Sequence, residues 1–316
     1  MLKSIIVRIF RKNRTKEVYI CQMFTELNSP LQHLAHPQLT NLWIKRDDLI
    51  DPYISGNKWR KLKYILQDAK IKQKAHLVTF GGAYSNHLVA TAAAAARSGL
   101  MSTAFVRGDE VENEMLVICK LYGMNLIFTT REDYKNKQAC FDKHFGSNPD
   151  TYFIDEGGAS TEAVKGCAEI ISELPLDTDH IFCAAGTGAT AAGLFKGIID
   201  AGLKTKLHVI PVLKGGDFIK DDISKYVEPN GQLLLHTAYH FGGYAKTQPE
   251  LLNFMQKFIS QTGILIDPVY TAKMFFAIYD LARINHFDNN KKIVAIHTGG
   301  LLGIMGMKEK LSRINS

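Results

Sequence analysis

No apolar run in the 316-residue sequence is long enough to cross a lipid bilayer, and the hydrophobic content of 46% is ordinary for a globular chain. The formal net charge of +7 comes from dispersed lysines and arginines, and no basic helix carries the interleaved aromatic side chains that stack on bases. We therefore expect neither a membrane span nor a nucleic-acid partner. An anionic substrate or cofactor accounts for the basic field more simply.

Paired cysteines and metal-ligand motifs are also lacking. The five cysteines include no C-x-x-C pair, have no histidine at metal-ligand spacing, and are scattered at Cys21, Cys119, Cys140, Cys167 and Cys183. This pattern is typical of reduced thiols and predicts a cytoplasmic protein without a metal site. The basic stretch 1–16 lacks the continuous apolar core and the small-residue cleavage site of a secretory signal, so we expect a pairing strand or a frayed end there.

Internal repeats and linkers rich in proline or serine are absent, which favours interleaved domains over domains strung end to end. Short β-branched runs alternate with helical stretches, which is typical of βαβ units and a largely parallel sheet. We expect strands near Leu42, His76, Ser102, Asn125, His180, Lys206 and Lys291, and helices at 57–72, 85–98, 111–122, 161–173, 189–201 and 270–285. The sequence thus predicts an α/β protein in which residues 1–55 and 151–316 form a large domain and residues 56–150 form a small inserted domain.

Three segments share one pattern, in which a buried strand runs into a glycine turn and then opens a helix: LVTFGGAYSNHLVATAAAAA, IFCAAGTGATAAGLF and IVAIHTGGLLGIMG. In open α/β sheets, ligands bind at the carboxyl ends of strands, where helix N-termini present free amides to anions. The best phosphate candidate is the GTGAT turn, formed by Gly186, Thr187, Gly188, Ala189 and Thr190. The other interpretation is structural, because small residues also let a helix pack close to a sheet.

The same turn matches the dinucleotide fingerprint G-x-G-x-x-G/A, which gives the alternative of a nicotinamide enzyme. The context does not favour it. The next strand ends at Leu213 and Lys214 instead of at the acidic residue that would hold a ribose 2′-hydroxyl, and a lysine suits only a 2′-phosphate. An NADP-dependent oxidoreductase therefore stays as an outside alternative. A Walker A sequence is absent.

One lysine stands in an unusual position in the segment SGNKWRKL. Lys58 comes at the start of an expected helix, just after a glycine and a capping-type residue, Asn57. The positive end of the helix dipole and the charges of Arg60 and Lys61 lower the pKa of such a lysine and favour a nucleophilic amine. A solvated surface lysine is the alternative interpretation of the same segment.

Six motifs follow one another along the chain: IKRDD at Ile44, SGNKWRKL at Ser55, GGAYSNH at Gly81, the GTGAT turn, DPVYTAK at Asp267 and HTGGLLG at His297. Together they resemble the D-cysteine desulfhydrase and 1-aminocyclopropane-1-carboxylate (ACC) deaminase family, over about Leu42 to Gly306. The resemblance implies a pyridoxal-phosphate enzyme of fold type II, with the two-domain, three-layer αβα architecture of the tryptophan synthase β-subunit and mostly parallel sheets. It also implies a homodimer and a small amino-acid substrate bound between the domains.

The resemblance further implies roles for individual residues. Lys58 would bind the cofactor covalently, and once freed it would remove the Cα proton of the substrate. Residues Gly186 to Thr190 would hold the cofactor phosphate, and Asn86 its phenolic oxygen. The substrate carboxylate would be faced by Ser85, Asn86 and His87. Catalytic roles, including proton transfer, are implied for Ser85, Tyr244 and Tyr270, although for each tyrosine the alternative is aromatic core packing.

The residue after Tyr270 favours one reaction within the family. The resemblance places the side chain of Thr271 at the pyridine nitrogen of the cofactor. A carboxylate there would keep that nitrogen protonated, whereas a hydroxyl leaves the ring neutral and suits β-elimination of a good leaving group such as a thiolate. We therefore expect D-cysteine desulfhydrase-type α,β-elimination that gives pyruvate, ammonia and sulfide. ACC deamination and D-serine-type deamination stay open, because Leu88, Val89, Ala272 and Leu302 depart from the residues usual in the family.

Overall fold

The computed structural model describes residues 27–36, 39–288 and 290–311. Cys21 and the basic stretch 1–16 lie outside these ranges. The described cysteines, Cys119, Cys140, Cys167 and Cys183, are free and buried, as expected for reduced thiols. No helix in the described ranges is long and apolar enough to cross a membrane.

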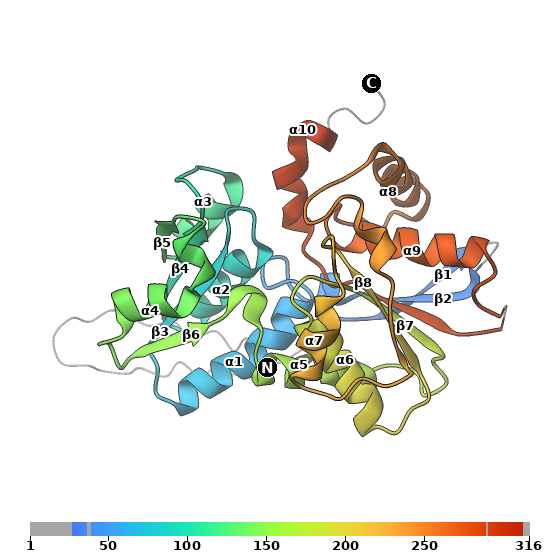
Figure 1. Ribbon diagram of the computed structural model, residues 1–316, viewed down its shortest axis with the longest axis horizontal. Coiled ribbons are helices and arrows are strands. Elements are labelled where there is room, and N and C mark those ends of the chain that lie inside the picture. The colour runs from blue at the N-terminus through green and yellow to red at the C-terminus, as the bar shows by residue number, and fades with distance from the viewer. Residues whose placement is uncertain (1–26, 37–38, 289, 312–316) are drawn as a thin grey trace, which may run out of the picture.

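The strands form two separate sheets (Figure 1). The larger has the order β1-β2-β10-β7-β8-β9, and only β1 and β2 pair antiparallel. Its strands are β1 (Leu31–His36), β2 (Leu39–Lys45), β7 (His180–Ala185), β8 (Lys206–Pro211), β9 (Leu233–Leu235) and β10 (Ile293–Ile296). The smaller sheet is parallel throughout, in the order β5-β4-β3-β6. Its strands are β3 (His76–Gly82), β4 (Met101–Arg107), β5 (Met124–Thr129) and β6 (Thr151–Ile154).

Ten α-helices occur in the described residues, and the six expected ones are among them, with ends within three residues of the predicted ones. They are α1 (Asn57–Ile71), α2 (Asn86–Arg97), α3 (Glu114–Leu121), α4 (Lys137–Phe145), α5 (Thr161–Ser172), α6 (Ala189–Asp200), α7 (Phe218–Ser224), α8 (Pro249–Thr262), α9 (Thr271–Arg283) and α10 (Lys308–Leu311). Short 3-10 turns complete the chain: η1 (Asp47–Leu49), η2 (Asp133–Lys135), η3 (Glu156–Gly158), η4 (Thr237–His240) and η5 (Leu301–Met307).

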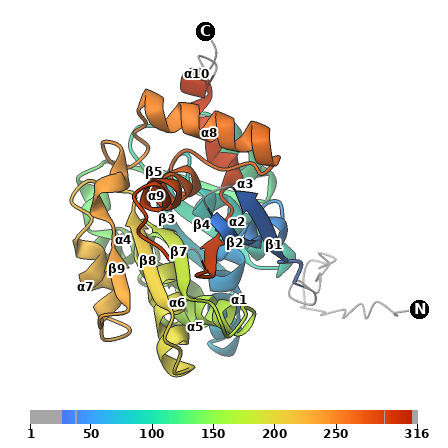
Figure 2. The same cartoon turned by 90° about the vertical axis from the view of Figure 1, so that its right-hand side faces the viewer.

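The large sheet is the middle of three layers (Figure 2). Successive side chains of a strand point to opposite faces. In β7, Phe182 and Ala184 therefore pack under α8 and α9, while Ile181, Cys183 and Ala185 pack against α5 and α6. Because both faces are covered, the strand is apolar over almost its whole length, as its sequence HIFCAA predicts.

The strands of the smaller sheet come almost entirely from the segment expected to form the inserted domain. β6 pairs with β3, so the smaller sheet reaches Ile154, beyond the inserted block expected at 56–150. Helix α1 lies between the sheets and packs against α5 of the large layer (Figure 1). The division of the chain into two domains stays a prediction. What matters for function is that the turns after β7 and β10 both contact the start of α1, through Thr190 and Thr298.

Candidate active site

The loop before Lys58 is fixed by contact with the turn after β10. Gly56 has φ +60, and a Cβ on it would lie 1.9 Å from the carbonyl oxygen of Thr298, so only glycine fits. The amide of Asn57 donates to the same oxygen at 3.3 Å. Helix α1 begins at Asn57, and Gly56 is its N-cap. The expected capping role of Asn57 was wrong, because its side chain donates to Thr190 Oγ1 at 2.9 Å and ties α1 to the GTGAT turn.

Lys58 has the electrostatic setting of an activated amine. Its Nζ donates to the carbonyl oxygen of Gly157 at 3.2 Å, and Lys61 Nζ donates to the same oxygen at 3.0 Å. Burial lowers the pKa of Lys58 well below its ordinary value, and the charge of Lys61 lowers it further. The pKa of Lys58 is thus lowered, as expected from the sequence. Its main cause is burial, which the sequence did not indicate.

The contribution expected from Arg60 was wrong. Its guanidinium points away from Lys58 and forms ion pairs with Asp47 and Glu173, of which the pair with Asp47 is 2.8 Å long. These carboxylates hold the arginine charged, because their hydrogen bonds outweigh the cost of burial and raise its pKa above the ordinary value. Arg60 therefore anchors the lysine helix to the large layer.

Lys61 is a site residue for which sequence reasoning gave no separate role. It is only 2% exposed, and the one acceptor recorded for its ammonium within the described residues is Gly157 O. Burial lowers the pKa of Lys61. Its position three residues after Lys58 could have indicated Lys61 as a site residue, since residues three apart lie on one face of a helix. A buried cation without a carboxylate suits an anionic ligand.

The GTGAT turn forms a cradle at the N-terminus of α6. Gly188 has φ +72 and is the N-cap, and a Cβ on Gly186 would lie 3.3 Å from Tyr270 Oη. The first amides of a helix have no partner within it, so this end of α6 presents donors to an anion. Gly157 joins the cradle, because a Cβ on it would lie 3.1 Å from Thr187 Cγ2. Lysines, a helix N-terminus and glycines without side chains together fit a phosphate group.

The two predicted tyrosines lie next to each other. The ring centroids of Tyr244 and Tyr270 are 6.1 Å apart with an interplanar angle of 74°. Burial raises the pKa of Tyr270 well above its ordinary value, and the adjacent Tyr244 raises it further. Tyr270 therefore keeps its hydroxyl proton at neutral pH and can act as a donor. Tyr244 is 44% exposed, at the outer side of the pair.

The SNH triplet opens α2 at the end of β3. Ser85 is the N-cap, and its hydroxyl makes no capping hydrogen bond. Asn86 extends toward the turn after β10, since a Cβ on Gly300 would lie 3.0 Å from its Nδ2. Asn86 therefore lies where the start of α2 meets the turn after β10.

His87, the third residue of this triplet, is buried, and its hydrogen bonds define its tautomer. Thr79 Oγ1 donates to the Ile154 carbonyl and therefore accepts from His87 Nε2 at 2.7 Å. Nδ1 is thus a bare acceptor, and it has no hydrogen-bond partner within the described residues. Burial, then Lys58 and Lys61, lower the pKa of His87 well below its ordinary value. A neutral His87 ring with an unpaired Nδ1 acceptor suits contact with a hydrogen-bond donor. It suits the substrate carboxylate, which the resemblance implies as its partner, less well.

Thr271 lies beside the tyrosine pair and is fully buried. Its hydroxyl donates to Asp267 Oδ1 at 2.8 Å, and the Asp267 carboxylate also accepts the amides of Val269, Tyr270 and Thr271. Asp267 thereby caps the start of α9. The side chain next to Tyr270 is therefore an uncharged hydroxyl supported by a buried carboxylate.

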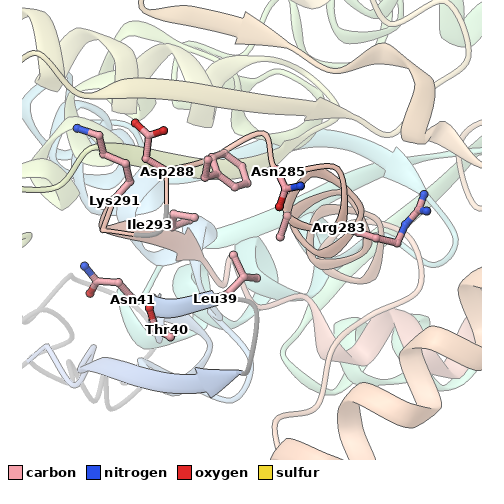
Figure 3. A pocket seen from close by; sticks show the side chains of 10 residues that line it. Leu39, Thr40, Asn41, Arg283, Asn285, Asp288, Lys291 and Ile293 are labelled. Carbon is pink, nitrogen blue, oxygen red and sulfur yellow. The ribbon is translucent and has the colours of Figure 1, made fainter.

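A separate pocket of about 140 Å³ lies at the amino ends of β2 and β10, beside the end of α9 (Figure 3). Arg283, Asp288 and Lys291 are among the residues that line it. None of the predicted site residues does. Ligands of α/β sheets bind at the opposite, carboxyl ends of the strands, so this pocket is not the catalytic site. The described residues also contain no group of three or more histidine, cysteine, aspartate or glutamate side chains that could hold a metal ion.

Comparison with known proteins defines the class. A family model described as pyridoxal-phosphate dependent enzyme matches residues 23–299. A putative ACC deaminase of Thermotoga maritima is 32% identical over 306 residues, covering 89% of this chain and 95% of the relative. The mitochondrial bifunctional D-cysteine desulfhydrase/ACC deaminase of Arabidopsis thaliana is 29% identical, covering 88% and 77%. The solved structure of an ACC deaminase homologue, 29% identical, superposes with a TM-score of 0.78 over 94% of this chain and 96% of that one.

The chain therefore belongs to the pyridoxal-phosphate dependent enzymes and, among them, to the ACC deaminase and D-cysteine desulfhydrase family. The predicted fold type, with two mostly parallel sheets, is confirmed, and so is the predicted cofactor. The nicotinamide alternative is not supported, because the family whose model matches residues 23–299 depends on a different cofactor. The individual roles of the site residues stay predictions.

Proposed function

We propose that this enzyme catalyses α,β-elimination from D-cysteine, in which D-cysteine and water give pyruvate, ammonia and hydrogen sulfide. The observation that carries the proposal is the half-buried Lys58 amine beside the phosphate cradle, whose pKa is lowered by desolvation and by the charge of Lys61. A neutral amine in that position can both bind an aldehyde and accept a proton.

The residues of the cradle fit pyridoxal phosphate. Lys58 would hold the cofactor covalently, Lys61 and the amides of 186–190 would bind its phosphate, and Asn86 would contact its phenolic oxygen. When bound, the cofactor supplies the electron sink for negative charge at the substrate Cα. Because the site is buried, charge-assisted hydrogen bonds to the phosphate are strong there.

The protein side chains would carry the proton transfers. Lys58 would take the proton from the substrate Cα, because its depressed pKa makes the amine available as a base. Tyr270 keeps its proton and can donate it near the leaving group, and Tyr244 lies against it. The start of α2 and the free Ser85 hydroxyl would bind the substrate carboxylate through hydrogen bonds. The bare Nδ1 of His87 would accept from a substrate donor.

The choice of D-cysteine rests on Thr271. Its side chain brings no charge of its own to the cofactor, and a neutral ring suits expulsion of a good leaving group more than ring opening. ACC deamination is the second candidate. It is favoured by the names of relatives about 30% identical to this chain, one of which is described as acting on both substrates.

The deciding experiment is incubation of purified protein with D-cysteine, L-cysteine, D-serine and ACC. Pyruvate, sulfide and 2-oxobutyrate are the readouts. We expect D-cysteine to react fastest and to release pyruvate and sulfide in equal amounts. Product from ACC or D-serine without sulfide release from D-cysteine would move the assignment to a deaminase.

Cofactor attachment is tested separately. The holoenzyme should absorb at about 410–430 nm, as lysine-bound pyridoxal phosphate does. We expect borohydride to abolish this band and Lys58→Ala to prevent it. Absorbance without turnover of any of the four amino acids would indicate a non-catalytic carrier. The expected homodimer and the cytoplasmic location rest on the resemblance and on the cysteine pattern, and light scattering of the purified protein tests the dimer.

A further inference from the structure

Lys273 is a buried cation with no role so far. It is fully buried in the first turn of α9, three residues after Tyr270. Within the described residues, no carboxylate forms an ion pair with its ammonium. Burial lowers the pKa of Lys273 to about 8, so the ammonium remains its main form at neutral pH. A buried unpaired charge is costly, and such groups persist where their hydrogen bonds are complete.

The three donors of this ammonium are all used by main-chain carbonyls. Nζ donates to His240 O and Gly243 O at 2.8 Å each, and to Val212 O at 3.2 Å. Val212 directly follows β8, and His240 ends η4. One side chain of α9 thereby joins two separate loops of the large layer.

The backbone between two of these acceptors is strained. Phe241 has φ +51, Gly242 +93 and Gly243 +119, and Ala245, just beyond the segment, has φ +53. Residues other than glycine disfavour positive φ, so such a conformation persists only where its surroundings impose it. The ammonium binds the carbonyls at both ends of the 240–243 segment and supplies that restraint.

The strained segment leads directly to the exposed member of the tyrosine pair. The carbonyl of Gly243 belongs to the peptide bond that joins it to Tyr244. Tyr270, against which Tyr244 packs, is the N-cap of the helix that carries Lys273. Lys273 therefore connects the backbone of one tyrosine to the helix turn of the other.

We propose that Lys273 is a positioning residue, whose ammonium holds the 240–243 segment against α9 and so places Tyr244 beside Tyr270. It touches neither substrate nor cofactor in this role. Its kinetic consequence rests on the proposed function, whereas the positioning itself does not.

The first test measures the loop without any activity assay. Hydrogen–deuterium exchange, read by mass spectrometry over 237–249, is compared in the wild type, Lys273→Met and Lys45→Met. Lys45 is the matched control, because it is another buried lysine, paired with Glu173 on the far side of the layer. The amides of Gly243 and Lys246 bond within the loop, to His240 O and Gly243 O. We expect Lys273→Met to speed exchange there by at least about tenfold, and Lys45→Met to leave it unchanged.

Unchanged exchange over 237–249 in a folded Lys273→Met protein would overturn the proposal. Equal acceleration across the whole chain, in both lysine variants, would do the same, since it would indicate general destabilisation. Should Lys273→Met not fold, Lys273→Gln is measured in its place with the same two outcomes, because its amide keeps two of the three donors.

The second test asks whether Lys273 acts through Tyr244. Turnover per cofactor-loaded site is measured for Lys273→Met, Tyr244→Phe and the double variant, with the substrate found above. We expect both single variants to lower kcat, and the double variant to lie within about twofold of the slower single one. A double variant whose loss of kcat equals the product of the two single losses would show independent roles and refute the coupling. If the wild type turns over none of the amino acids, the proposed function fails while the exchange experiment still decides the role of Lys273.

Discussion

A row of three histidines makes a specific prediction about acid stability. His208, in β8, lies between His180 Nδ1 at 2.9 Å and His236 Nε2 at 2.8 Å, and its ring stacks on Phe182 at a centroid distance of 4.3 Å. His208 is fully buried. Burial, followed by the nearby His236, His180, His286 and Lys206, lowers its pKa to about 2.

The sign and size follow from proton linkage. Above pH 6.5 the imidazole is neutral in both the folded and the unfolded chain, so it does not affect stability. Between pH 6.5 and about 2 only the unfolded chain binds the proton, and stability falls as the pH falls. For His208 alone the loss is about 1.4 kcal/mol per pH unit, or about 2 kcal/mol at pH 5. Burial also lowers the pKa of His180 and of His236 to about 4, so they add to the same slope.

The perturbation is His208→Gln, which removes the titration but keeps one donor and one acceptor. Urea unfolding of both proteins is measured at pH 8, 7, 6 and 5. The difference at pH 8 records the cost of the substitution itself. We expect the free energy of unfolding of the wild type to fall more steeply below pH 6.5, by about 1.4 kcal/mol per unit. Parallel pH dependences for the two proteins would refute this reasoning.

Three further substitutions test the site. Gly56→Ala should lower the free energy of unfolding by about 2 kcal/mol or more, because it combines a positive φ with a Cβ 1.9 Å from Thr298 O. Urea unfolding measures this loss. A variant as stable as the wild type would contradict the close contact. Arg60→Met should cost about 3–5 kcal/mol in the same assay, since it leaves the Asp47 carboxylate buried without its cation. Lys61→Met should raise the dissociation constant of pyridoxal phosphate by about tenfold or more, measured by absorbance titration, and an unchanged constant would exclude Lys61 from the phosphate site.

The sequence predicted those strands and helices that carry a clear pattern within their own residues. The alternation of apolar runs with amphipathic stretches predicted seven of the strands and six of the helices. Helix α8 was missed although its sequence carries a proline at N1 and Glu250 in the first turn, both typical helix-start signals. β9 is only three residues long and half-buried, so it carries no periodic signal.

The site was predictable as a set of motifs but not in its electrostatics. Lys58 was predicted from the motifs around it, and the contribution of Lys61 to its lowered pKa was expected, but the main cause, burial, was missed. Arg60 follows it by two residues, yet its partners Asp47 and Glu173 come from distant parts of the chain. Lys273 stood inside a quoted motif, and its importance appeared only when the fold brought three carbonyls around it. Local spacing cannot reveal such contacts.

The middle of the large sheet is built from one of the last segments to be synthesised. β10 lies between β2 and β7, and the carbonyl of Thr298 just beyond it receives the amide at the head of the lysine helix. A nascent chain can complete the four-stranded sheet early, but β2 and β7 leave the ribosome long before the strand that separates them, with edges open to wrong pairing. Lys58 acquires its final position only near the end of translation. A premature stop before Ile293 would therefore leave a gap in the centre of the larger sheet and remove the Thr298 carbonyl that contacts the loop before Lys58.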